Sequence, residues 1–143
     1  MKQRYLLLYM AWLIAVVSTA GSLYFSNVLG FPPCDLCWWQ RIFTYPMVFV
    51  LFVGLWRKDV SVPYYILPLA IMGSIFALYQ NLIYEGIIPE VIKTCSNGVS
   101  CTTKYIELFG FISIPMLSLI SYIVIILLNI AFLRMGKEHS KNL

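Results

Sequence analysis

The sequence predicts an all-α membrane protein, a bundle of four transmembrane helices. Of the 143 residues, 61% are apolar and 11% charged, against roughly 45–50% and about 25% in soluble proteins. Four apolar stretches are each long enough for a membrane span, because a hydrocarbon core of roughly 30 Å takes about 20 helical residues. Basic residues also divide unevenly between the two ends of these stretches, which is typical of multi-pass membrane proteins.

The first span is expected at about 5–29, where Gly30 and the following prolines stop the helix. Its apolar run continues too far for the core of a cleavable signal peptide. The others are expected at about 39–56, 64–83 and 114–133, which leaves outer loops at 30–38 and 84–113. No soluble segment of domain size separates them, so residues 1–143 are expected to form a single integral membrane domain.

Charge predicts the orientation of the bundle. A cytoplasmic N-terminus places seven basic residues inside and three outside, in agreement with the positive-inside rule. Both termini are then cytoplasmic, and two cysteine-containing loops face the oxidising side, where disulfides persist. The inner residues are Lys2, Arg4, Arg57, Lys58, Arg134, Lys137 and Lys141, and the outer ones are Arg41, Lys93 and Lys104.

The first cysteine pair, Cys34 and Cys37, forms a Cys-x-x-Cys at the expected start of the second helix. The positive end of the helix dipole there favours a thiolate on Cys37. Arg41 lies four residues on, one turn deeper on the same helical face. We interpret Arg41 as a partner of Cys37, although a basic residue beside Trp38 and Trp39 also fits snorkelling at the lipid interface.

The second pair, Cys95 and Cys101, flanks Asn97-Gly98, a turn signal that brings the two sulfurs together. Closing so small a loop stabilises a protein by only about 2 kcal/mol, so thiol exchange is favoured over a structural bridge. A tetrathiolate zinc site is a further alternative, but the Cys-x5-Cys spacing does not favour it, and no metal is expected.

These features resemble the bacterial disulfide-bond formation protein B (DsbB) family, and within it the short-looped BdbC-like branch. The resemblance covers nearly the whole chain. It depends on the stretch from Pro33 to Arg41 (Pro-Cys-Asp-Leu-Cys-Trp-Trp-Gln-Arg), on the second cysteine pair and on the stretch from Phe109 to Pro115 that opens the last helix.

The resemblance implies a membrane thiol-disulfide oxidoreductase that reoxidises an extracytoplasmic thioredoxin-like partner and passes the electrons to a membrane quinone, menaquinone or ubiquinone. By position, Cys95 forms the mixed disulfide with the partner, Cys101 pairs with Cys34, and Cys37 faces the quinone with support from Arg41. It also implies a place in the bacterial cell membrane, in contact with lipid and with no nucleic acid partner.

Dithiol oxidation needs an electron acceptor, and the sequence has no Gly-x-Gly-x-x-Gly motif and no haem attachment motif. A lipid-soluble quinone is the acceptor that needs no such motif. The chain also lacks a histidine near the outer end of the third span. Tyr79, Gln80 and Asn81 are therefore candidate contacts of the quinone head, although ordinary interfacial hydrogen bonding is the favoured interpretation for all three.

Two alternatives remain at this stage. The vitamin K epoxide reductase-like family also couples disulfides to quinones in a small helical bundle, but its quinone-side cysteine pair lies late in the bundle. A non-enzymatic membrane accessory subunit would use both cysteine pairs as structural disulfides only.

Overall fold

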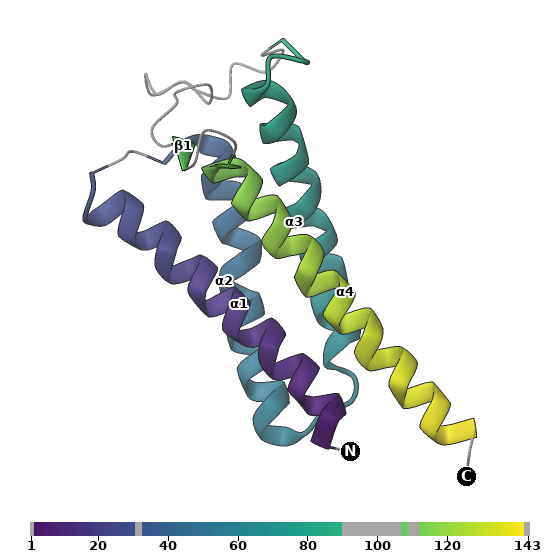
Figure 1. Cartoon of the computed structure of the whole chain (residues 1–143). Helices are drawn as coiled ribbons and strands as arrows, with labels where there is room; N and C mark the ends of the chain where they lie inside the picture. Colours follow the sequence, from purple (N-terminus) through teal and green to yellow (C-terminus); the bar gives the residue numbers. More distant parts are fainter. Residues whose placement is uncertain (1, 31–32, 90–106, 109–111, 142–143) are drawn as a thin grey trace.

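The computed structural model describes residues 2–30, 33–89, 107–108 and 112–141 (Figure 1). Within them lie four long helices and a minimal antiparallel sheet that pairs Leu108 with Ile112. The helices are α1 (Lys2–Asn27), α2 (Asp35–Arg57), α3 (Val62–Tyr84) and α4 (Ile114–Lys141), and the strands are β1 (Glu107–Leu108) and β2 (Ile112–Ser113). The prediction of an all-α protein with four long apolar helices is confirmed, since each helix is long and apolar enough to cross a membrane.

Two helix boundaries differ from the sequence expectation by more than three residues. Helix α2 starts at Asp35 instead of 39, because Cys34 already caps its first turn through its sulfur. Helix α4 continues to Lys141, beyond the expected end at 133, because charged residues at the end of a span extend a helix past the apolar region without breaking it.

The four helices form a ring in which each packs on two neighbours. Helix α1 contacts α2 and α4, and α3 contacts the same two helices from the other side. Both termini lie at one end of the bundle, and the α1–α2 connection, the end of α3 and the start of α4 lie at the opposite end (Figure 1). The first cysteine pair therefore lies at the end away from both termini.

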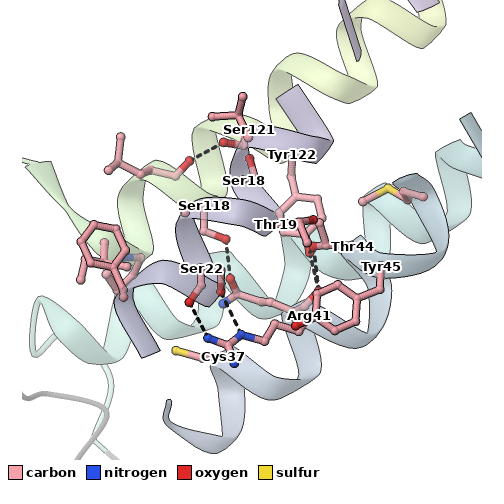
Figure 2. A pocket seen from close by; sticks show the side chains of 18 of the residues that line it. Ser18, Thr19, Ser22, Cys37, Arg41, Thr44, Tyr45, Ser118, Ser121 and Tyr122 are labelled. Atoms are coloured by element: carbon pink, nitrogen blue, oxygen red, sulfur yellow. Dashed lines mark hydrogen bonds between the residues drawn. The ribbon is translucent and has the colours of Figure 1, made fainter. Parts of the chain in front are cut away.

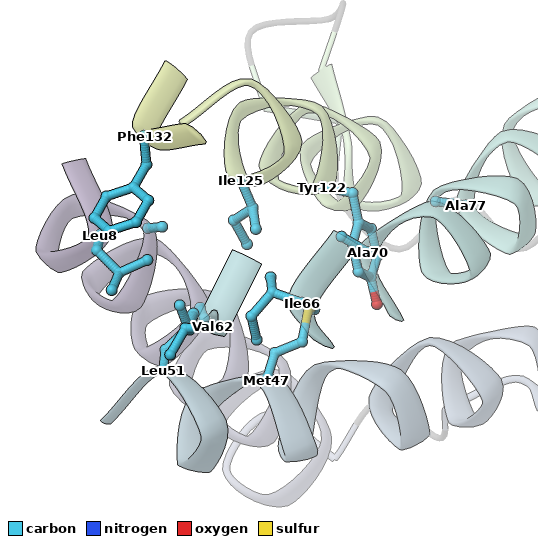
Figure 3. Packing of buried hydrophobic residues seen from close by; sticks show 12 residues of the cluster. Leu8, Met47, Leu51, Val62, Ile66, Ala70, Ala77, Tyr122, Ile125 and Phe132 are labelled. Carbon is cyan, nitrogen blue, oxygen red and sulfur yellow. The ribbon is translucent and has the colours of Figure 1, made fainter. Parts of the chain in front are cut away.

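Small side chains let the helices approach closely. Ala11, Ala15, Ala70 and Ala77 are fully buried in the core that Figure 3 shows, and Gly73 of α3 lies directly against the ring of a tyrosine on α4. Lipid is as apolar as leucine, so helix association in a membrane depends on this close packing and on hydrogen bonds. The core thus fixes the helix spacing on which the polar contacts near the first cysteine pair depend.

The end that carries the termini is closed by polar contacts to backbone carbonyls. The Arg4 guanidinium lies 4.2 Å from the centre of the Phe132 ring, and its Nε donates to the Phe132 carbonyl at 3.2 Å. The Tyr5 hydroxyl donates to the carbonyl of Lys58 in the α2–α3 turn at 2.9 Å. These contacts join α1 to α4 and to the turn, so the bundle is fixed at the end opposite the cysteines.

Candidate functional site

The first cysteine pair forms the N-terminal turn of α2. Cys34 is the N-cap residue, with extended backbone angles of φ −70 and ψ 162, and its sulfur accepts a hydrogen bond from the Cys37 amide. A sulfur thus takes the place that a serine or aspartate oxygen usually has at a helix start. The two sulfurs lie 2.9 Å apart, so the capping geometry itself places the pair within reach of a disulfide.

A third polar side chain contacts both sulfurs. Gln80 of α3 donates from Nε2 to Cys34 Sγ and to Cys37 Sγ, at 3.3 Å each. The side chains of Cys34 and Gln80 are 7% and 4% exposed. Cys34 is therefore buried where the start of α2 meets α3, whereas Cys37 beside it is half-buried.

A chain of hydrogen bonds continues from Gln80 across the bundle. Gln40 of α2 donates from Nε2 to Gln80 Oε1, and Ser118 of α4 donates from its hydroxyl to Gln40 Oε1. The Tyr122 hydroxyl donates to the Gln40 carbonyl at 2.8 Å and lies 2.7 Å from the Thr44 hydroxyl. Three helices thus contribute to one polar network in the half of the bundle that carries the first cysteine pair.

Arg41 is turned toward α1. Its Nε donates to Ser22 Oγ at 2.8 Å, and its Nη2 donates to the Ser22 carbonyl at 2.8 Å and to Ser26 Oγ at 2.9 Å. The side chain is 8% exposed, with the guanidinium carbon 5.4 Å from the Trp38 ring centre. This burial does not fit a side chain that snorkels to the lipid surface.

A cavity of about 290 Å³ opens beside these residues. Figure 2 shows Cys37 and the Arg41 guanidinium at the same end of it. Hydroxyl groups face it from α1, α2 and α4, and apolar side chains complete its walls. The polar lining is Ser18, Thr19, Ser22, Gln40, Thr44, Tyr45, Gln80, Ser118, Ser121 and Tyr122, and the apolar lining includes Val17, Phe25, Met47 and Ile125.

The donor set of the cavity matches a planar molecule with carbonyl oxygens and an apolar tail. A cationic guanidinium and several hydroxyls can hydrogen-bond to carbonyl oxygens, and the volume is close to the lower end of small-molecule sites, about 300 Å³. The cavity lies between helices that are long and apolar enough to cross a membrane. A quinone head group fits these residues.

Several predicted residues fall outside the described part of the chain. Cys95 and Cys101 lie in the segment 90–106, and so do Lys93 and Lys104. The described residues alone contain no group of three or more side chains of the types that bind metals, but a four-cysteine zinc site would need the second pair.

The sequence interpretation missed most of the polar network. Gln40, Ser22, Ser26 and Ser118 were not singled out, and Gln80 was expected to make ordinary interfacial hydrogen bonds. One signal was available: Gln40 directly precedes Arg41, and an amide inside a membrane span is costly unless it has a partner. The identity of that partner depends on the packing of α2 against α3 and α4.

Comparisons with known proteins point to one family. The family model described as "Disulfide bond formation protein DsbB" matches residues 2–132. The chain is similar to "Probable disulfide formation protein C 2" of Bacillus cereus, with 51% identity over 82% of this chain and 84% of the relative. It is 44% identical to "Disulfide bond formation protein C" of Bacillus subtilis, over 89% of this chain and 92% of the relative. No solved structure matches the chain.

Proposed function

The chain belongs to the DsbB family of disulfide bond formation proteins, which are quinone-dependent oxidoreductases of the membrane, and we propose that it reoxidises a thioredoxin-like partner on the outer side and passes the electrons to a quinone in the cavity beside Cys37. One observation carries this proposal: Cys37 contacts Cys34 and also lines a cavity between membrane spans. A sulfur in this position can exchange with a disulfide and can also face a lipid-soluble oxidant.

The distribution of basic residues supports the orientation in this proposal. Seven of the ten lysines and arginines lie toward the end of the bundle with the termini, which favours that end as the cytoplasmic one. The cysteine end then faces the oxidising side. Residues 1–143 act as one membrane domain in this arrangement, with both redox loops on the outer side.

The proposed electron path follows thiol-disulfide exchange. The partner's two thiols become a disulfide and give up two electrons and two protons, while the Cys95–Cys101 disulfide is reduced through a mixed disulfide on Cys95. Cys101 then attacks Cys34, and the bond between Cys34 and Cys37 breaks to leave Cys37 as the thiolate. Cys95 then attacks Cys101, which restores the Cys95–Cys101 disulfide and releases Cys34 as a thiol. Re-formation of the Cys34–Cys37 disulfide gives up two electrons and two protons, for which a bound quinone would be the acceptor. The pairing of Cys101 with Cys34 follows the family pattern.

Three parts of the site support the quinone-side role of this chain's residues. Cys34 keeps Cys37 within exchange distance by capping the same turn. Arg41, held by Ser22 and Ser26, provides a fixed positive charge at the end of the cavity that Cys37 lines. Apolar side chains form part of the cavity wall, and a less polar surrounding strengthens the electrostatic effect of that charge. In this proposal the cavity residues bind and orient the quinone, and the cysteine sulfurs carry out thiol-disulfide exchange.

Replacing Cys37 by serine tests the proposal. The purified variant should lose quinone-dependent oxidation of a reduced thioredoxin-like partner by at least a thousandfold, since serine cannot form the disulfide. Ser74→Ala is the control, because among the described residues this hydroxyl bonds to the Ile71 carbonyl of its own helix at an exposed position. Both variants are assayed with quinone absorbance as the readout. Unchanged turnover in Cys37→Ser would refute the proposed role.

The two alternatives from the sequence lose support. A match to the DsbB family over residues 2–132 favours this family over the vitamin K epoxide reductase-like one. Membership in an oxidoreductase family also sets aside a purely structural accessory subunit.

A further inference from the structure

Gln80 is the described residue whose side chain hydrogen-bonds to both cysteine sulfurs at once, and its own orientation is fixed by a second amide. We propose that Gln80 is a catalytic hydrogen-bond donor that makes the Cys34–Cys37 pair more oxidising, with Gln40 and Ser118 as positioning residues. The inference rests on the proposed function, because it takes Cys34–Cys37 as a redox pair that cycles.

The Gln80 carboxamide is able to donate hydrogen bonds to both sulfurs. Its nitrogen carries two N–H groups and lies at 3.3 Å from each sulfur. The side chain is 4% exposed, so water does not compete for these donors. One side chain from α3 thus serves both atoms that exchange on α2.

The orientation of the Gln80 amide is fixed by its hydrogen bond with Gln40. Gln80 Oε1 accepts from Gln40 Nε2, which leaves Gln80 Nε2 as the group that faces the sulfurs, and Gln40 Oε1 in turn accepts from Ser118. The three donors of this hydrogen-bond series, Ser118, Gln40 and Gln80, all point toward the cysteine pair. Aligned hydrogen bonds polarise one another in a low-dielectric interior, so Ser118 and Gln40 strengthen the bonds that Gln80 donates.

The sign of the effect follows from the charge on sulfur. In the disulfide both sulfurs are neutral, whereas reduction breaks the S–S bond, adds two electrons and leaves thiols or a thiolate. Hydrogen bonds to an ionised acceptor are stronger than those to a neutral one. Gln80 therefore stabilises the reduced pair more than the disulfide, and a pair whose reduced form is stabilised is a stronger oxidant.

The experiment measures the dithiol–disulfide equilibrium of the full chain in detergent, with Cys95 and Cys101 replaced by serine so that only Cys34–Cys37 titrates. The redox buffer is excess reduced and oxidised glutathione at fixed ratios under argon, and the reduced fraction is read by thiol alkylation. Gln80→Met keeps the length of the side chain but removes the donor. We expect the equilibrium to move at least tenfold toward the disulfide, which corresponds to about 30 mV for two electrons.

The neighbouring residue provides a matched control. Asn81 is also an amide on α3, but it donates to the Ala77 and Pro115 carbonyls. Asn81→Leu removes a comparable helix–helix contact and should leave the equilibrium within twofold of the starting protein. Gln40→Met should shift it in the same direction as Gln80→Met but by less, about threefold, because it loosens the donor without removing it.

A second substitution guards against a folding defect in Gln80→Met. Gln80→Glu keeps the shape but lacks both N–H groups, and an ionised carboxylate repels a thiolate, so it should shift the equilibrium at least as far. Equilibria within twofold of the starting protein in both Gln80 variants, or an equal shift in Asn81→Leu, would overturn the inference. Failure of the unsubstituted Cys34–Cys37 pair to titrate at all would instead overturn the proposed function.

Discussion

The hydrogen bonds between Arg41 and α1 allow the loss of stability in one substitution to be predicted from the geometry. Ser22→Ala removes the hydroxyl that accepts from Arg41 Nε at 2.8 Å and leaves the two Nη2 bonds in place. The Nε–H then has no acceptor, and the side chain is 8% exposed, so water replaces the lost partner poorly. The substitution therefore isolates one charge-assisted hydrogen bond between α1 and α2.

The expected loss in the free energy of unfolding of Ser22→Ala lies between two reference values. Hydrogen bonds to charged groups contribute about 1.5–3 kcal/mol, whereas hydrogen bonds between helices in a membrane average about 0.6 kcal/mol. We expect Ser22→Ala to lower the free energy of unfolding by about 1–2 kcal/mol, which is roughly a five- to thirtyfold change in the folded-to-unfolded ratio.

Unfolding in mixed detergent micelles measures this value, and a double-mutant cycle assigns it to the pair. If the hydroxyl acts through Arg41, Ser22→Ala should cost almost nothing in an Arg41→Met background, with a coupling of about 1–2 kcal/mol. Ser74→Ala should stay within about 0.5 kcal/mol of the parent. Additive effects of Ser22→Ala and Arg41→Met would refute the reasoning. The KM for quinone should rise in Ser22→Ala as well, because the guanidinium is no longer fixed at the cavity.

Gly73→Ala should destabilise the bundle by about 1–3 kcal/mol in the same unfolding assay, because the added Cβ would lie 2.4 Å from the Tyr122 ring. Gly21→Ala, where the added Cβ meets no atom within 4 Å, should leave stability unchanged, and equal effects of the two substitutions would contradict the packing argument. In cells, Cys101→Ala should trap a thioredoxin-like protein on Cys95, visible as a cross-linked band on a non-reducing gel that is lost with reductant. A structural disulfide at these positions would give no such band.

Composition and hydropathy were sufficient to predict the helical architecture. A span needs a run of apolar residues that is local in sequence, so each of the four helices could be located from its own residues. The boundary at Asp35 was missed because a cysteine is an unusual N-cap, and its capping role depends on a backbone conformation that residue type alone does not indicate. The end of α4 was missed because polar residues after a span leave both a turn and a continued helix open.

The candidate site was predictable only in part. Cys34, Cys37 and Arg41 were named because their spacing along one helix is itself the signal. Gln80 was named with a different expected role, since its contact with the sulfurs depends on how α3 packs beside α2. Ser22 and Ser26 were not named, because a serine inside a span is usually satisfied by its own helix.

The sequence by itself thus determined that the chain spans a membrane and where its helices lie, and it predicts two cysteine pairs as the reactive groups, because these properties depend on residues close together in the chain. Only the tertiary structure decided that Arg41 is held by α1, that Gln80 donates to both sulfurs, and that Cys37 lines a cavity between helices. Those contacts join side chains from different helices, and the rotation of each helix in the bundle is set by the packing of all four.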